Sequence, residues 1–175
     1  MAMSLTFALL HSPLLGPATW SRLVPELASR GHETLVLQLD DDGHAPFWRQ
    51  QATAASRGLA ARQAGSPVVL VPHSGAGPLV PAVASLAPGT VAACVFLDAG
   101  LPCQGTRFDS FAAERGENAA DAFRALLDRG GRYPEWRDYD LAPLVPEAAD
   151  RVSVLGEMHP RGAAFWDEPC EFNPE

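Results

Sequence analysis

Ser74 lies in a run of residues that could support nucleophilic catalysis. Residues 68–77 read VVLVPHSGAG: an apolar strand-like run, a turn with a serine at its tip, and the start of a small-residue helix. A strand that enters a helix through such a turn exposes the serine hydroxyl at the carboxyl end of the sheet. The N–H of Gly75 and the helix dipole would then favour the oxyanion formed when the hydroxyl attacks a carbonyl. The pattern therefore predicts a nucleophile elbow, with Ser74 as nucleophile and Gly75 as oxyanion donor.

The sheet that would position this turn is predicted by four apolar runs. Each is continuous rather than alternating, as strands buried on both faces of a parallel sheet are. The runs are Leu5–Leu10, Thr34–Leu39, Pro67–Val71 and Val91–Leu97. The segments of helix length between them are Thr19–Ser29, Phe47–Gln63 and Gly75–Leu86. This alternation predicts a doubly wound α/β fold with a mostly parallel sheet.

The chain changes character after residue 102. Residues 103–175 interleave prolines, aromatic residues and charges, and no run among them has the pattern of a strand. Helices are predicted over Asn118–Arg129, Glu147–Gly156 and Arg161–Trp166. We therefore expect a sheet-based core over residues 1–102 and a helical segment over residues 103–175.

Three further segments resemble the α/β-hydrolases, and in particular their esterase and hydroxynitrile-lyase-like branch. Residues 9–20, LLHSPLLGPATW, resemble the loop after the first strand, with Trp20 nine residues after His11. Residues 23–32, LVPELASRGH, resemble the first helix of that branch, and residues 95–102, VFLDAGLP, resemble the strand end that leads into a lid. Together with the elbow, these matches cover residues 5–102 in the right order.

The resemblance implies a serine hydrolase acting on a small ester, lactone or amide. Ser74 would be the nucleophile, and Gly75 and a residue of the His11 loop would bind the oxyanion. His11, His73 and Gly77 would support the loop and the elbow. The helical segment over residues 103–175 would form the lid.

The sequence departs from the family pattern at the oxyanion hole and at the base. Pro13 stands where a backbone N–H usually binds the oxyanion, and proline has none, so Leu14 is the candidate second donor. Pro72 stands where the elbow usually has glycine. The family's catalytic histidine follows the last strand, whereas the one histidine after the fourth run is His159, in a segment expected to be lid helix. Asp98 is the candidate acid; the alternative is that it caps or orients the lid.

Three interpretations of the whole chain remain open. It is part of a hydrolase whose histidine lies in a further C-terminal segment, a non-catalytic member that binds a small molecule or a protein, or a half-enzyme completed by a second chain. A sheet that ends at Val91–Leu97 leaves an apolar edge, and such edges recruit further strands. A homodimer through this edge is therefore one expectation.

Composition excludes several other classes. The net charge of −8 and the absence of lysine argue against nucleic acid as a partner. The apolar N-terminus has no charged residue before Arg22 and is broken by Pro13, so neither a signal peptide nor a membrane span is expected. Three cysteines without paired spacing favour a reducing cytoplasm. Asp40–His44 lacks the spacing of a metal loop, and Val80 breaks a dinucleotide fingerprint. We expect neither metal nor cofactor.

Overall fold

The computed structural model describes residues 5–62, 66–102 and 105–169. Gln63, Cys103 and Cys170 lie outside the described residues. Four strands form a parallel sheet in the order β2-β1-β3-β4. They are β1 (Thr6–Leu10), β2 (Glu33–Leu37), β3 (Val68–Ser74) and β4 (Val91–Cys94). The predicted mostly parallel sheet is therefore confirmed, and a strand forms at each of the four apolar runs.

The fourth run differs from the prediction, because it forms two strands rather than one. β4 ends at Cys94, and β5 (Leu97–Ala99) pairs with the end of β3. β3 itself continues three residues beyond the predicted Val71. Its pairing with β1 ends at Pro72, and its pairing with β5 begins at His73. Proline therefore stands where the strand changes partner, a position at which a missing ladder donor is tolerated.

Two of the three predicted helices begin later than expected. A short 3-10 helix, η1 (Pro17–Trp20), precedes α1 (Leu23–Ser29), so Thr19 does not start an α-helix. In the same way η2 (Gly77–Leu79) precedes α3 (Val80–Leu86). Prolines occupy the first turn of η1, η2 and α3, where their missing N–H costs no helical bond. Helix α2 (Phe47–Ala61) begins at the predicted residue.

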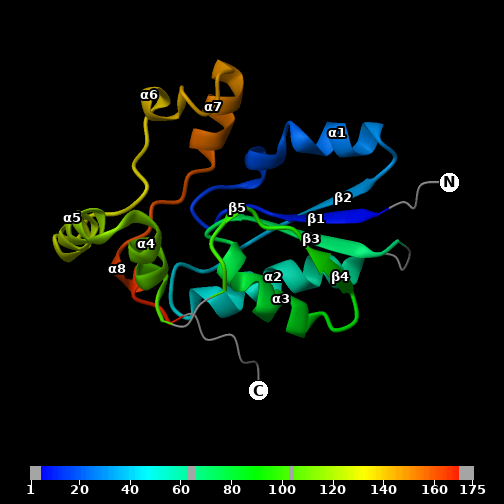
Figure 1. Cartoon of the computed structure of the whole chain (residues 1–175), viewed down its shortest axis with the longest axis horizontal. Coiled ribbons are helices and arrows are strands. Elements are labelled where there is room, and N and C mark those ends of the chain that lie inside the picture. Colours follow the sequence, from blue (N-terminus) through cyan, green and yellow to red (C-terminus); the bar gives the residue numbers. More distant parts are fainter. Residues whose placement is uncertain (1–4, 63–65, 103–104, 170–175) are drawn as a thin grey trace.

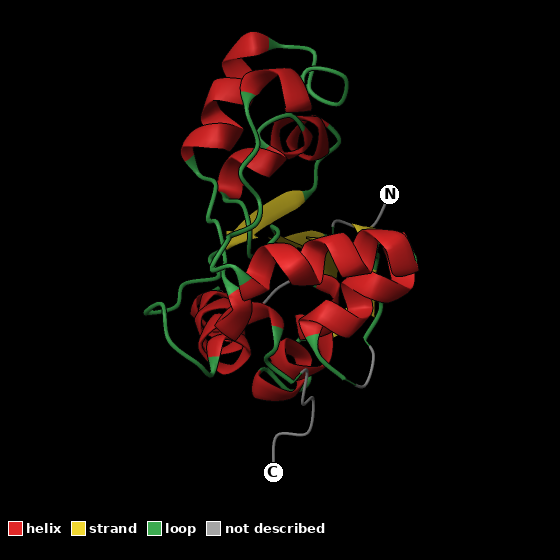
Figure 2. Cartoon of the chain, turned by 90° about the vertical axis from the view of Figure 1, so that its left-hand side faces the viewer, coloured by secondary structure: helices red, strands yellow, loops and turns green. Residues whose placement is uncertain are grey.

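The helices cover both faces of the sheet, as Figures 1 and 2 show. Leu9, Val69 and Val71 pack with Trp20 and the apolar side of α1. The alternate residues of the same strands point to the opposite face, where they pack against α2 and α3; they include Ala8, Leu10 and Leu70. Burial of each such aliphatic side chain contributes about 1.5–3 kcal/mol. The continuous apolar pattern of β1 and β3 thus reflects burial on both faces of the sheet. The fourth run also differs from the prediction in its burial, because β4 and β5 lie at the edge of the sheet and most of their side chains are exposed.

Residues 105–169, here called the lid segment, are helical and lie beyond the carboxyl ends of the strands (Figure 1). The predicted helices are present as α5 (Glu117–Asp128), α7 (Ala148–Gly156) and α8 (Ala163–Trp166). Two helices were not predicted, α4 (Arg107–Arg115) and α6 (Asp138–Leu141). The sequence carried a signal for α4, because Thr106 and Asp109 form a capping box at its start. Within the described residues no helix is long and apolar enough to span a bilayer.

Two sets of contacts hold the lid segment on the sheet core. An aromatic cluster joins Phe123, Phe165 and Trp166 of the lid to Leu14 and Phe47 of the core. Beside it lies a buried polar set, here called the Asp41 network, whose members are Asp41, Gln51, Arg107, Arg161 and Glu168. Arg161 donates two hydrogen bonds to Asp41, at 2.9 and 2.8 Å. Gln51 joins Asp41 to Arg107, which faces Glu168.

Candidate active site

Ser74 stands at a tight turn between β3 and η2. It is the last residue of β3 and has a φ of +52°, a left-handed conformation that side chains other than glycine rarely adopt. Such a conformation costs on the order of 1–3 kcal/mol and persists where the surroundings impose it. Here the Gly100 N–H donates to the Ser74 carbonyl at 3.1 Å, and the Ala76 N–H donates to the His73 carbonyl at 3.1 Å. The turn directs the serine towards a cavity.

Gly77 is required by the packing of the elbow. A Cβ atom on this residue would overlap the carbonyl oxygen of Gly100. The helix after the serine therefore approaches the end of β5 more closely than any residue with a side chain would allow. Gly75 is different, because a Cβ there would lie 3.6 Å from Pro13 Cδ, an ordinary contact.

The loop after β1 supplies the facing side of a candidate oxyanion hole. Within the described part of the chain, no hydrogen bond occupies the N–H of Gly75. The Leu14 N–H donates to Ser12 Oγ at 3.3 Å, a long bond. Pro13 and Leu14 line the same cavity as Ser74 and Gly75. The loop thus brings the two predicted donors to one cavity, with the second N–H held by a neighbouring hydroxyl.

His11 is buried and His73 is half-buried, and neither lines the cavity. Burial lowers the pKa of both imidazoles, which keeps them neutral at neutral pH. His11 Nδ1 lies 2.9 Å from the Ser12 carbonyl oxygen, and the His73 ring meets Trp20 edge-on at 5.8 Å. These contacts fix the loop after β1 against the end of β3.

His159 lies in the loop between α7 and α8, not in a helix as the sequence suggested. Its N–H donates to the Leu14 carbonyl at 2.9 Å, so its backbone braces the loop after β1. The cavity that holds Ser74 is lined by eighteen described residues, and none of them is a histidine. The geometry therefore offers Ser74 no imidazole base from the described residues.

Asp98 is the predicted acid, and it reaches the cavity from β5. Its φ of +44° is again left-handed, and its side chain is exposed. Among the described residues its carboxylate has no hydrogen-bond or ion-pair partner, so no bond ties it to the lid segment. Burial lowers the pKa of His73, and the charge of Asp98 raises it against that larger effect.

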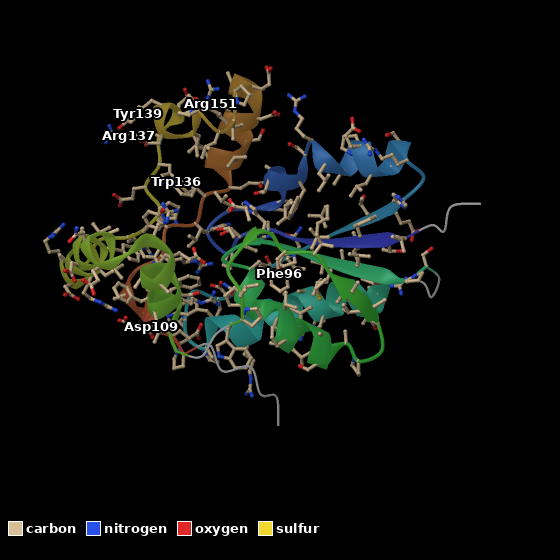
Figure 3. All side chains as sticks on the ribbon, viewed as in Figure 1. Phe96, Asp109, Trp136, Arg137, Tyr139 and Arg151 are labelled. Carbon is tan, nitrogen blue, oxygen red and sulfur yellow. The ribbon has the colours of Figure 1, made fainter. Side chains whose placement is uncertain are left out.

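The cavity has a volume of about 630 Å³ and lies between the elbow and the lid segment. Sequence reasoning missed most of its lid-side wall, because that wall is built largely on α4. Helix α4 contributes Arg107, Ser110, Phe111, Glu114 and Arg115. The aromatic lining comprises Phe96, Phe111, Tyr133, Trp136, Phe165 and Trp166. Figure 3 shows Phe96 beside the strands and Trp136 on the segment that leads into α6.

Two carboxylates of the Asp40–His44 loop, those of Asp41 and Asp42, form hydrogen bonds within the protein. Asp41 binds Arg161 and Gln51, as described above. Asp42 accepts hydrogen bonds from the Gln50 side chain and the His44 N–H, both at 3.0 Å. The loop therefore joins the core to the lid segment and to α2.

Several solved structures resemble this chain in fold. One is an extracellular α/β-hydrolase from a Paenibacillus species, which is described as sharing structural and functional homology with tobacco salicylic acid binding protein 2. It superposes with a TM-score of 0.71 at 20% sequence identity, and the alignment covers 94% of this chain and 70% of that one. Polyneuridine aldehyde esterase superposes with a TM-score of 0.65 at 19% identity, over 95% and 72%.

A variant of tomato methylketone synthase I complexed with β-ketoheptanoate gives a TM-score of 0.64 at 19% identity, over 91% of this chain and 68% of that one. No protein-family model matches the sequence, and neither does any curated protein. Identities this low establish architecture rather than activity. The chain therefore has the α/β-hydrolase fold.

Proposed function

We propose that Ser74 is the nucleophile of a serine hydrolase site for small esters, lactones or amides. The observation that carries the proposal is the left-handed φ of +52° at a serine that ends a buried strand and lines a cavity with aromatic walls. Attack of Ser74 Oγ on the substrate carbonyl would form a tetrahedral oxyanion beside the Gly75 N–H. The Leu14 N–H would join once it leaves Ser12 Oγ. Collapse of this intermediate would expel the alcohol or amine, and water would then release the acyl group.

The proposal includes a general base from polypeptide beyond these 175 residues. A serine hydroxyl is a weak nucleophile at neutral pH without one, and loss of the histidine of such a site can cost about 10⁶-fold in turnover. Asp98 would orient that base from the end of β5. The base could belong to a longer form of the same chain or to a second chain.

A second candidate function is non-catalytic binding of a small molecule. Two observations favour it: none of the residues that line the cavity is a histidine, and the Leu14 N–H is engaged with Ser12 Oγ at 3.3 Å. In that case the elbow would be an inherited feature of the fold. The aromatic cavity would remain as the ligand site.

Labelling with an alkyl fluorophosphonate separates the two functions. The reagent is incubated with the purified chain and with the Ser74→Ala variant in the presence of imidazole, which stands in for the absent base. Adduct formation is followed by intact-protein mass spectrometry. One adduct per chain, absent from the variant, supports the nucleophile. A folded protein that gains no adduct over hours overturns it and leaves the binding function.

A further inference from the structure

The Ser74 cavity is lined by two exposed carboxylates. Asp98 comes from β5 and Glu114 from α4, and neither makes a hydrogen bond or an ion pair within the described part of the chain. Their elements meet at Gly100. A Cβ on Gly100 would lie 3.1 Å from Glu114 Oε1 and 3.7 Å from Ser110 Oγ. Because the Gly100 N–H bonds the Ser74 carbonyl, this acidic wall stands next to the elbow.

The cavity is also lined by aromatic side chains, which are suited to a cation. Tyr133 and Trp136 meet edge-on at 5.8 Å, and both line the cavity with Phe96 and Trp166. Positive groups already use neighbouring rings: the Arg107 guanidinium lies 4.2 Å from the centroid of Phe165. An ammonium group bound between such rings and a carboxylate gains from both the ring quadrupole and the negative charge.

Two arginines, Arg107 and Arg115, also line the cavity. Their positive charges oppose the binding of a cation, but to different extents. Arg107 faces Glu168 and donates to Gln51, so its charge is already compensated. Arg115 lies 5.8 Å from the Phe111 centroid, and its charge lowers the pKa of Tyr133 against the larger effect of burial. Asp98, Glu114 and Arg115 together leave one net negative charge, and Glu114 lies beside the elbow.

We propose that the cavity selects ligands with a positively charged ammonium group, so that the esters taken by Ser74 would be esters of amino alcohols or amino acids. The hydrolysis of such esters rests on the proposed function of Ser74, whereas the preference for a positive charge concerns the cavity alone. Glu114 is the specificity-determining carboxylate. Anionic ligands would be disfavoured by the same two carboxylates.

The test compares acetylcholine with dimethylbutyl acetate, its neutral isostere in which carbon replaces nitrogen. Binding to the full chain is measured by ligand-observed NMR in a Ser74→Ala background, so that turnover cannot contribute. We expect acetylcholine to bind about fivefold more tightly, the size of a combined cation–π and partly exposed charge interaction. Glu114→Gln should lower the ratio of the two affinities about threefold, and Arg115→Gln should raise this ratio.

The matched control is Glu117→Gln, an exposed carboxylate that follows α4 but does not line the cavity. It should leave the preference unchanged. Equal binding of the two esters, tighter binding of the neutral one, or a preference that survives Glu114→Gln would overturn the inference. Failure of Ser74 to react with the fluorophosphonate would instead refute the proposed function and leave this binding result standing.

Discussion

The ion pair between Asp41 and Arg161 is expected to be a principal attachment of the lid segment. The Asp41 side chain is 2% exposed and that of Arg161 is 15% exposed. Asp41 also accepts a hydrogen bond of 2.7 Å from Gln51 and one of 3.0 Å from the Gly43 N–H. The Arg161 guanidinium lies 5.2 Å from the centroid of Phe165, a residue of the cavity wall. Loss of one partner would leave the other charge buried beside an apolar cluster.

Asp41→Asn removes the charge while it keeps the shape. Breaking a buried pair in this way costs about 3–5 kcal/mol, and the partial exposure of Arg161 places the expected loss near 3 kcal/mol. For a chain of this size that lowers Tm by roughly 6–12 °C. Urea unfolding followed by tryptophan fluorescence measures the loss. The double variant Asp41→Asn with Arg161→Met should recover most of it, because no unpaired charge then remains.

The control is Asp138→Asn, which breaks the ion pair with Arg151 at 2.7 Å. Asp138 is 59% exposed, so this change should cost no more than about 1 kcal/mol. A loss below 1 kcal/mol for Asp41→Asn, or a double variant no more stable than the single one, would refute the view that this pair holds the lid segment.

Four further results are expected. Burial alone would raise the pKa of Asp41, but the hydrogen bonds from Arg161 and Gln51 outweigh it and hold the pKa below its usual value. The ionised carboxylate therefore stabilises the fold above its unfolded pKa, and the destabilisation by Asp41→Asn should shrink as pH falls through the lower folded pKa. Urea titrations in which this destabilisation does not vary with pH would contradict the prediction. Gly77→Ala should lower the free energy of unfolding by more than about 2 kcal/mol, measured by thermal unfolding, because the new Cβ would overlap the Gly100 carbonyl. Gly75→Ala should leave the stability nearly unchanged. Similar losses of stability for both variants would contradict the close packing at Gly77. If Ser74 lacks only a base, imidazole should accelerate its fluorophosphonate labelling in a concentration-dependent way; an unchanged rate would show that more than the base is missing. The predicted homodimer through residues 91–97 should appear in light scattering as a concentration-dependent mass that Val95→Lys abolishes, and a monomer at all concentrations would rule it out.

The elbow could be predicted because its determinants are contiguous. Strand, turn and helix around Ser74 lie within ten residues, so the order of apolar and small residues is enough to predict the local shape. The loop after β1 was expected only from the resemblance of residues 9–20 to the α/β-hydrolases. Local backbone preferences and burial on both faces of the sheet act over short stretches of sequence, which is why the strands and the turn around Ser74 were predicted.

The wall of the cavity that α4 provides could not be predicted, because α4 meets the end of β5 only in the folded chain. Glu114 lies beside Gly100, and no periodic pattern in the sequence connects the two residues. The division of Val91–Leu97 into two strands has a similar origin. It depends on β3 changing partner after Pro72, a tertiary effect that the apolar run itself does not record.

The bridge between Thr106 and Pro169 brings the two ends of the lid segment together. The chain thus leaves the helices beside the point at which it entered them, and Glu168 returns to the core by accepting a hydrogen bond of 3.0 Å from the Trp48 N–H. A segment whose two ends lie together can be exchanged as a unit without moving the core. Its helices could be lengthened, shortened or replaced by those of another protein of this fold while the sheet and the serine turn keep their packing. Ligand choice and chemical machinery would then change independently of each other.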